Sequence, residues 1–396
     1  MSTKLPFGSA DILLPKADFE RWACIACDQF TSQPEYWERA DAIAGGAPSA
    51  LRLILPEVYL GDGNDEARIR EINDTMRRYL AEGVFNEYKN AMICTERTQP
   101  DERVRRGIVG AFALADYSYE PGAKCLIRPT EGTVLSRIPP RVAIRRDAPL
   151  ELPHIMVFMD DRRREIIEGI DTSRLVKLYD FELMLGGGHL RGWLIDAAEQ
   201  QRILAALARL EEESGTEGKK LLFAVGDGNH SLATAKAAAE VIGTDAARYA
   251  LAELVNIHSE AISFEPIYRV LFDADTADVL CALHAAFPAQ SGRAVEYITR
   301  GEHGRVYVAG LETGEMQRFI DGYTAARPDV RVDYIHGEDT VRALAAQEGA
   351  IGFLYGGISK DELFDYVREN GILPRKSFSV GHAEDKRYYV EARRIR

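Results

Sequence analysis

The stretch KKLLFAVGDGNHSLATAKAAAEVIG, residues 219–243, contains the signals of three successive kinds of local structure. Residues 221–225 form an apolar run followed by a glycine, which is typical of a buried strand. The alanine-rich residues that end at Gly243 are typical of a helix. Between these segments, residues 226–231 (GDGNHS) supply glycines for a tight turn and polar side chains for a first helical turn. The sequence therefore predicts a strand, a turn and a helix in direct succession.

The start of this predicted helix is suited to anion binding. The first N–H groups of a helix lack acceptors within the helix, and the helix dipole adds positive potential, so phosphate groups often bind there. Gly226, Gly228, Asn229 and Ser231 are the candidate phosphate-binding residues of the turn. The alternative is a helix start that is capped by its own side chains and holds no ligand. The turn is not a P-loop, because the Gly-Lys-Ser/Thr ending is absent.

Titratable side chains in and near the turn are candidates for catalysis. His230 titrates near neutral pH, and Asp227 carries a carboxylate. Glu131, within residues 128–133 (RPTEGT), adds a carboxylate of the kind that acts as a general base or holds a metal. We therefore expect Glu131, Asp227 and His230 to be the catalytic residues of any enzyme built here.

Basic side chains elsewhere are candidates for phosphate contacts. Arginine offers a forked pair of donors to phosphate, and Arg128 and Arg137 flank Glu131 in the sequence. Lys376 and Ser377 place a cation beside a hydroxyl near the C-terminus. The alternative for both segments is an exposed turn with incidental charges.

Length and composition indicate a folded protein of more than one domain. The 396 residues exceed the usual size of one domain, and an apolar content of 46% permits a large core. We expect residues 1–270 to form a phosphate- or nucleotide-binding core with insertions, and residues 271–396 to form a smaller α+β portion packed on it. The expected fold class is α+β, or mixed α/β, because hairpins and single helices are mixed along the chain.

Charge and cysteine content narrow the classes of function. A formal net charge of −13 disfavours nucleic acid as a partner, because broad nucleic-acid binding requires a basic face. The apolar runs fall short of the roughly 18 residues of a membrane span, and the first residues lack the apolar core of a signal peptide. An odd number of cysteines, five, fits a reducing compartment, so we expect a cytoplasmic protein. The sequence leaves the oligomeric state open.

Cys24 and Cys27 have the spacing of thiol redox motifs and of zinc ligands. Their neighbours Trp22 and Phe30 are typical of a core, so two packed thiols are the first interpretation. A thiol redox protein that acts through Cys24 and Cys27 is the alternative.

Periodicity predicts many of the remaining elements. Strands are expected at residues 51–60, 104–116, 152–159, 350–355 and 387–394. Helices are expected at residues 65–81, 196–213, 246–255 and 359–369, and from about residue 339. Residues 304–311 and 315–320 alternate around Glu312-Thr313-Gly314 and predict a hairpin.

Residues 227–231 (DGNHS) resemble the Asp-Gly-His-His-Arg signature of domain-of-unknown-function family 1015. Three further segments resemble family landmarks in the same order: residues 128–133 (RPTEGT), 266–269 (PIYR) and 374–377 (PRKS). The signature is also similar to the phosphate-binding turn of the ParB/sulfiredoxin-like superfamily. This resemblance implies a ParB/sulfiredoxin-like core with large insertions and a C-terminal α/β portion.

The resemblance also implies a function. In that superfamily the turn and the helix start hold nucleotide phosphates, so Gly228, Asn229, His230 and Ser231 would line a phosphate site. The implied ligand is a small phosphorylated molecule, with ATP or ADP and Mg²⁺ as cofactor. The implied activity is that of a small-molecule phosphotransferase, similar to an amino- or hydroxy-acid kinase. A non-catalytic nucleotide or metabolite sensor is the alternative.

The chain departs from the family pattern at three positions. Asn229 stands in place of the first His, Ser231 in place of the Arg, and Thr130 in place of the His of an Arg-His-Glu-x-Thr element. Arginine provides a fixed charge and a bidentate grip that serine lacks. We therefore expect Arg128, Arg137 or Lys376 to supply the charge from elsewhere.

Overall fold

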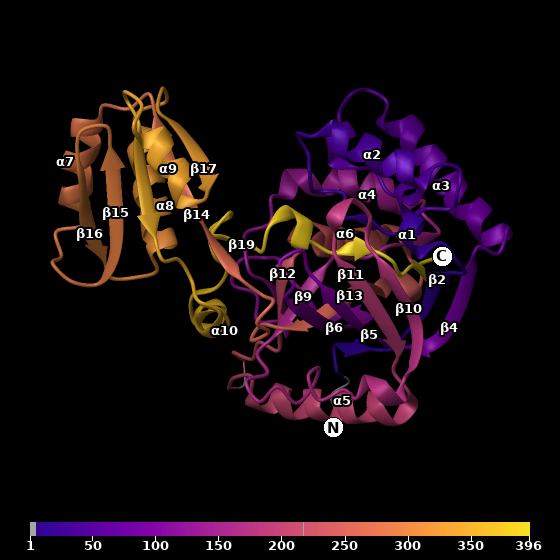
Figure 1. The fold of residues 1–396 in the computed structure, drawn as a ribbon. Coiled ribbons are helices and arrows are strands. Elements are labelled where there is room, and N and C mark those ends of the chain that lie inside the picture. The colour runs from indigo at the N-terminus through magenta and orange to yellow at the C-terminus, as the bar shows by residue number, and fades with distance from the viewer. Residues whose placement is uncertain (1–4, 217) are drawn as a thin grey trace. The chain divides into compact units, whose positions relative to one another are not determined.

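The computed structural model describes residues 5–216 and 218–396, and the chain forms two compact units (Figure 1). Unit 1 contains the chain up to Ile262 with residues 368–371 and 381–396, and unit 2 contains residues 263–367 and 372–380. Helices and strands alternate in both units, so the expected mixed α/β fold class is confirmed. The units differ from the expected division because residues 381–396, the C-terminal segment, return to unit 1.

Within the described residues, a nine-stranded sheet forms the centre of unit 1. Its order is β10-β11-β5-β6-β13-β9-β12-β7, and β1 pairs with β6 outside this path. Most neighbours are antiparallel, whereas β13 is parallel to β9 and β12 is parallel to β7. The strands are β1 (Phe7–Gly8), β5 (Ile93–Thr98), β6 (Val104–Ala113), β7 (Ile127–Pro129), β9 (Met156–Met159), β10 (Val176–Glu182), β11 (His189–Leu194), β12 (Phe223–Asp227) and β13 (Tyr249–Asn256).

Helices cover both faces of this sheet, as Figure 1 shows for α5 on one side and α2 and α3 on the other. Successive side chains of a strand point to opposite faces. In β6, Ile108 packs in the core that α5 and α6 share, and Val109 packs in the core that α2 and α3 share. The helices of unit 1 are α1 (Phe19–Trp22), α2 (Pro34–Ala44), α3 (Asp65–Ala81), α4 (Ile138–Arg146), α5 (Ala197–Glu213) and α6 (Asn229–Ile242).

Short antiparallel strand pairs complete unit 1. In two of them a strand of the C-terminal segment pairs with a strand from the first half of the chain. The pairs are β2 (Ala10–Pro15) with β4 (Phe85–Ala91), β3 (Cys24–Ile25) with β20 (Tyr388–Tyr389), and β8 (Leu150–Glu151) with β21 (Arg393–Arg394).

Unit 2 has a smaller antiparallel sheet of order β16-β15-β18-β14-β17, with β19 paired to β14. Apolar residues of α7, α8 and α9 pack on this sheet in one core. The strands are β14 (Phe264–Phe272), β15 (Arg293–Thr299), β16 (His303–Val308), β17 (Arg331–His336), β18 (Ile351–Tyr355) and β19 (Phe378–Val380). The helices are α7 (Thr276–Ala286), α8 (Glu312–Ala325) and α9 (Glu338–Ala345), and α10 (Lys360–Asn370) leads from unit 2 to unit 1.

Three predicted elements are wrong. Residues 51–60 form two 3₁₀ turns, Ala50–Leu53 and Glu57–Tyr59, because Ser49 caps the first turn and Pro56 interrupts a strand. The predicted helix at 246–255 is instead β13, whose helix-forming residues are overridden by burial in the middle of the sheet. The predicted hairpin at 304–320 is β16 followed by α8. There, Met316 and Ile320 are buried four residues apart, a spacing that also fits a helix.

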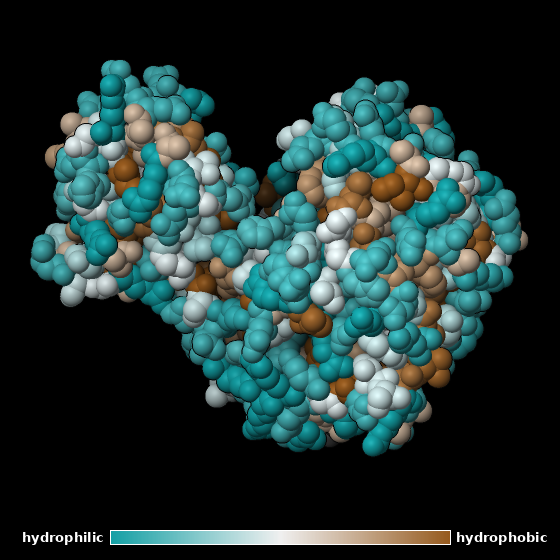
Figure 2. Space-filling view, viewed as in Figure 1, coloured by the Kyte–Doolittle hydropathy of each residue, from teal (hydrophilic) through white to brown (hydrophobic). Residues whose placement is uncertain are grey.

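Hydrophilic residues dominate the face shown in Figure 2, and apolar residues occur there in small patches. Among residues 5–216 and 218–396, five large apolar side chains are exposed, and they lie far apart in the sequence: Ile43, Val104, Leu135, Val176 and Val241. Single exposed apolar residues of this kind are normal on folded proteins. None of the helices in the described ranges has both the length and the apolar character of a membrane span.

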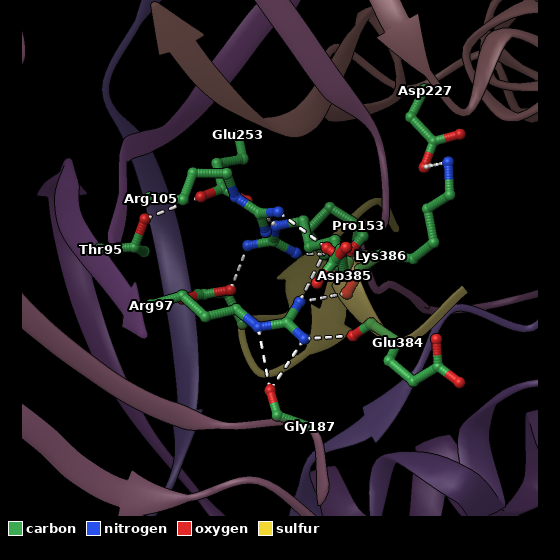
Figure 3. Close-up of polar contacts among 12 residues, drawn as sticks. Thr95, Arg97, Arg105, Pro153, Gly187, Asp227, Glu253, Glu384, Asp385 and Lys386 are labelled. Atoms are coloured by element: carbon green, nitrogen blue, oxygen red, sulfur yellow. Dashed lines mark hydrogen bonds and ion pairs between the residues drawn. The ribbon is translucent and has the colours of Figure 1, made fainter. Parts of the chain in front are cut away.

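Buried arginines fix the C-terminal segment to the sheet of unit 1 (Figure 3). Arg97 of β5 donates hydrogen bonds to the backbone oxygens of Glu384, Asp385 and Lys386. Arg105 of β6 donates to the oxygen of Asp385 over 2.8 Å. The segment is therefore held by side chains that reach out of two central strands.

Buried carboxylates pair with Arg105 and with Arg387 of the segment: Oε2 of Glu253 lies 3.8 Å from Nη2 of Arg105. Nε of Arg387 lies 3.0 Å from Oε2 of Glu253, and Nη2 of Arg387 lies 2.5 Å from Oε2 of Glu391. Burial opposes ionisation of Glu253, but the charges of Arg105 and Arg387 hold the pKa of its carboxyl below the usual value. A paired charge in such a place is costly to disrupt, because the remaining partner stays buried without compensation.

Replacing Arg387 by Met should strongly destabilise unit 1. The substitution leaves Glu391 buried without its cation and Glu253 with Arg105 alone, and breaking a buried pair in this way costs about 3–5 kcal/mol. Urea unfolding measures the change. Arg394→Met is the matched control, because Arg394 is exposed and its loss should change the free energy of unfolding by less than about 0.5 kcal/mol. Equal losses of stability in the two variants would contradict the structural role of these buried ion pairs.

Candidate functional site

The stretch that predicted a strand, a turn and a helix folds as β12, a glycine turn and α6, which confirms that prediction. Gly228 precedes α6 with a φ of 77°, a conformation that strains other residues. Gly226 lies against the ring of Phe158, where a Cβ atom would approach Cε2 to 2.1 Å. The backbone conformation at Gly228 and the close packing at Gly226 therefore explain why glycine occupies both positions. All of residues 226–231 are partly exposed.

The start of α6 differs from a helix start that is closed by its own side chain. The carboxylate of Asp196 caps α5 by accepting a hydrogen bond from the backbone of Glu199. The N-cap residue of α6 is Gly228, which has no side chain to make such a bond. The self-capped alternative is therefore not observed, and the first N–H groups of α6 are left for another acceptor.

The hydroxyl of Ser231, in the first turn of α6, contacts a buried histidine. Oγ of Ser231 lies 2.7 Å from Nε2 of His154, a residue of the loop before β9. The other ring nitrogen, Nδ1, lies 2.8 Å from the hydroxyl oxygen of Tyr389 in β20. The backbone N–H of Cys27 donates to the same tyrosine oxygen over 3.2 Å. Segments that are distant in sequence therefore meet at the start of α6.

Two carboxylates and a lysine complete this group. Oδ2 of Asp28 lies 3.9 Å from Nε2 of His154, and Nζ of Lys386 lies 3.5 Å from Oδ2 of Asp227 (Figure 3). Burial opposes ionisation of Asp28, but His154, a hydrogen bond from Gln29 and the charge of Lys386 hold the pKa of this carboxyl below its usual value. We call the following residues the α6 cluster: Asp28, His154, Asp227, His230, Ser231, Lys386 and Tyr389.

His230 faces the loop before α4. Its Nε2 accepts a hydrogen bond from the backbone N–H of Val134 over 3.1 Å, so this nitrogen carries no proton. Burial and the charges of Arg141 and Arg137 lower the pKa of His230 to about 4. The imidazole is therefore neutral at pH 7, and its unprotonated nitrogen is already occupied.

Arg137 and Arg141 place positive charge near the start of α6, where this charge lowers the pKa of His230. Arg137, one of the predicted phosphate ligands, is exposed at the start of α4. Arg141 lies one turn further along α4 and pairs with Glu57. Helices α4 and α6 pack against each other, so both arginines lie on a neighbouring element.

The segment 128–133 runs beside the turn because β7 pairs with β12 in parallel. The hydroxyl of Thr130 donates to the backbone oxygen of Val225 over 2.8 Å. Glu131 follows and is partly exposed. The guanidinium of Arg128 is buried and donates to the backbone oxygen of Lys220 over 3.1 Å, so it is engaged with the backbone.

Lys376 and Ser377 belong to unit 2, whereas the other predicted residues belong to unit 1. Nζ of Lys376 lies 5.1 Å from the centre of the Tyr334 ring. The hydroxyl of Ser377 donates to the backbone oxygen of Pro374 over 2.6 Å. The role of both residues in phosphate binding stays a prediction.

Sequence reasoning missed four members of the α6 cluster: Asp28, His154, Lys386 and Tyr389. Asp28 directly follows Cys27, and a single carboxylate beside the cysteine pair is a weak signal. His154 follows a proline at the start of an apolar strand, where a lone histidine is a weak signal. Lys386 and Tyr389 reach the cluster only through the fold of the C-terminal segment. No local motif identifies them.

Cys24 and Cys27 have the properties of packed thiols. Burial raises the pKa of Cys24 well above its usual value, and burial and the charge of Asp28 raise the pKa of Cys27 to about 12. The thiolate is the reactive form of cysteine, and these shifts disfavour it at neutral pH. The structure thus gives no support to the redox alternative.

A pocket of about 610 Å³ opens elsewhere in unit 1. Its lining comes from the chain between Gly45 and Glu82, including parts of α3 and both 3₁₀ turns. None of the residues that line this pocket belongs to the α6 cluster.

Comparison with known proteins identifies the family of this chain. The family model described as "Protein of unknown function (DUF1015)" matches residues 6–357, so the chain belongs to that family. No curated protein matches the sequence. The matched region contains the turn and α6 but ends before Lys386 and Tyr389.

Several solved structures are distantly similar to the chain. A free serine kinase in complex with AMP has a TM-score of 0.40 and 11% identity, covering 71% of this chain and 90% of that chain. A conserved hypothetical protein from Pyrococcus furiosus has a TM-score of 0.37 and 11% identity, covering 68% and 92%. SbnI with C-terminal truncation from Staphylococcus aureus has a TM-score of 0.39 and 11% identity, covering 69% and 82%.

The depressed pKa of His230 predicts a specific pH dependence. An unfolded histidine titrates near 6.5, whereas the folded side chain titrates near 4. The unfolded state therefore binds the proton first on acidification, and the contribution of His230 to stability is lost as the pH falls from 6.5 towards 4. His230→Gln keeps a polar side chain without this titration, so its stability should fall less steeply over that range. An imidazole resonance of His230 that titrates near 6.5 in the folded protein would contradict the assignment.

Proposed function

We propose that the start of α6 binds the phosphate groups of a nucleotide or of another phosphorylated metabolite. The observation that carries this proposal is a helix start without a side-chain cap that lies beside the ammonium group of Lys386. An uncapped helix start combines free N–H donors with positive potential, which favours phosphate. Lys386 adds a full charge that the turn itself lacks.

The charge of Lys386 is suited to this role because it is only partly engaged. An ammonium group has three N–H donors, and the contact with Asp227 at 3.5 Å uses a single carboxylate oxygen. Arg137 lies near the same helix start and is exposed. These two cations take the place of the family Arg that Ser231 replaces.

The remaining candidate ligands keep their predicted roles within the proposal. Gly226 and Gly228 shape the turn, and Asn229 and Ser231 line the helix start. Arg128 is proposed as a further phosphate contact, and the phosphate-binding role of Lys376 and Ser377, which belong to unit 2, stays a prediction. We also propose that the turn belongs to the ParB/sulfiredoxin-like kind and that the protein acts in the cytoplasm.

We further propose an enzymatic role. The protein would act as a small-molecule phosphotransferase that uses ATP or ADP with Mg²⁺. Phosphoryl transfer depends mainly on positioning and on charge stabilisation. Mg²⁺ usually binds through one or two carboxylates and the phosphates of its nucleotide, and Asp227 and Asp28 are carboxylates of this kind. Among the described residues, no group of three or more His, Cys, Asp and Glu side chains forms a metal site of its own. Glu131 and Asp227 are the proposed bases.

A non-catalytic sensor of nucleotides or metabolites is the second candidate. The hydrogen bonding of His230 favours a sensor. The ring nitrogen that would take a proton already accepts a hydrogen bond from the backbone N–H of Val134. A phosphate site without a working base at His230 binds its ligand without transferring a group.

Binding of ADP tests the proposal directly. We expect ADP, ATP or pyrophosphate, with or without Mg²⁺, to raise the melting temperature of the protein, because a ligand that binds only the folded state stabilises it. Lys386→Met should weaken ADP binding roughly ten- to hundredfold, since a hydrogen bond to a charged group contributes about 1.5–3 kcal/mol. Ser231→Glu should abolish binding by placing a negative charge at the helix start.

Lys124→Met is the matched control for this experiment, because Lys124 is an exposed lysine of unit 1 outside the α6 cluster. Its affinity for ADP should equal that of the unmodified chain, as measured by isothermal titration calorimetry. The absence of binding by ADP, ATP and pyrophosphate alike would refute the proposal. Equal affinity in Lys386→Met and Lys124→Met would place the nucleotide elsewhere.

A further inference from the structure

The hydroxyl of Ser231 and the imidazole of His154 form a pair that phosphate binding alone does not require. We infer that Ser231 is a nucleophile that accepts the terminal phosphoryl group of a nucleoside triphosphate, with His154 as its general base. This inference rests on the proposed function, because the helix start must first hold the phosphates. It adds a covalent step at a residue of the chain itself.

The two side chains have the geometry of a nucleophile and its base. Oγ of Ser231 lies 2.7 Å from Nε2 of His154, within the range of a short hydrogen bond between them. Ser231 is partly exposed, whereas only 8% of His154 is exposed. A substrate can therefore reach the hydroxyl, while the base is shielded from water.

One assignment of protons satisfies the hydrogen bonds around His154 and leaves Nε2 free to accept a proton. Nδ1 donates to the hydroxyl oxygen of Tyr389, which also accepts from the backbone N–H of Cys27. Tyr389 is thus a positioning residue, because it holds the ring nitrogen of His154 opposite the one that faces Ser231.

Asp28 supplies the charge that the base needs after it takes the proton. Its Oδ2 lies 3.9 Å from Nε2 of His154. An ionised carboxylate at this distance stabilises an imidazolium ion by Coulomb attraction. The arrangement therefore contains a nucleophile, a base, a residue that orients the base, and a counter-charge.

Oγ of Ser231 attacks the terminal phosphorus of the nucleoside triphosphate, and a new O–P bond forms. The bond between that phosphorus and the oxygen it shares with the second phosphate breaks, and its electron pair leaves with the nucleoside diphosphate. The hydroxyl proton of Ser231 passes to Nε2 of His154. The product is a phosphoserine in the first turn of α6, where the helix dipole and Lys386 stabilise its negative charge.

Thr234, a neighbouring hydroxyl residue of α6, has a structural role. Oγ1 of Thr234 donates to the backbone oxygen of His230 over 2.7 Å, which is a bond within the helix and involves no base. Thr234 is also buried. Thr234→Val therefore offers a matched control that removes a hydroxyl without touching the proposed nucleophile.

The test is to incubate the full chain with ATP and Mg²⁺ and to map the modified residue by mass spectrometry. We expect one added phosphoryl group on the peptide that contains Ser231. Ser231→Ala should abolish it, Ser231→Thr should retain it, and Thr234→Val should leave the rate unchanged. His154→Gln should lower the rate at least about 100-fold, the usual effect of losing a general base. Circular dichroism and ADP affinity show whether each variant is folded and still binds.

The outcomes separate this inference from the proposed function. Nucleotide binding without any phosphoserine overturns the inference and leaves the proposed function intact. The absence of nucleotide binding overturns both. A phosphoryl group that maps to another residue of the unmodified chain, or that persists in Ser231→Ala, overturns the inference even if a variant fails to fold.

Discussion

Unit 1 depends on the buried arginines that hold the C-terminal segment: Arg97 and Arg105 donate to its backbone oxygens, and its own Arg387 pairs with Glu253 of β13. Residues 381–396 lie far from the central strands in the sequence, and they are brought into the core by guanidinium groups that donate to their backbone oxygens. Burying so many charges is costly unless each has a partner. Glu253 and Glu391 are the carboxylate partners of Arg105 and Arg387, whereas backbone oxygens accept from Arg97, and these contacts together fix the path of the segment.

This path determines the composition of the α6 cluster. Lys386 directly precedes Arg387, and Tyr389 follows two residues later, so the anchored segment delivers a cation and a hydroxyl to the start of α6. The turn after β12 contributes the helix start and Ser231, while the first half of the chain contributes Asp28 and His154. The proposed chemistry thus depends on long-range contacts more than on the turn itself. A phosphate site of this design is lost when the C-terminal segment is displaced.

The sequence predicted the local parts of this picture and missed the long-range ones. The turn at residues 226–231 and the helix α3 carry their signals within a few residues, so periodicity and glycines identified them. The strand β13 was misjudged because its alanines and leucines favour a helix, while burial in the sheet decides the outcome. Lys386 could not be predicted as a site residue, because its role follows from buried ion pairs that join distant segments.

The central claim is that phosphate binds where the anchored segment meets the start of α6. A crystal structure of the protein grown with ADP tests this claim most directly. The account predicts phosphate oxygens within hydrogen-bonding distance of the backbone N–H groups of the first turn of α6 and of Nζ of Lys386. Phosphates bound at any other place, with the start of α6 holding no part of the nucleotide, would contradict it.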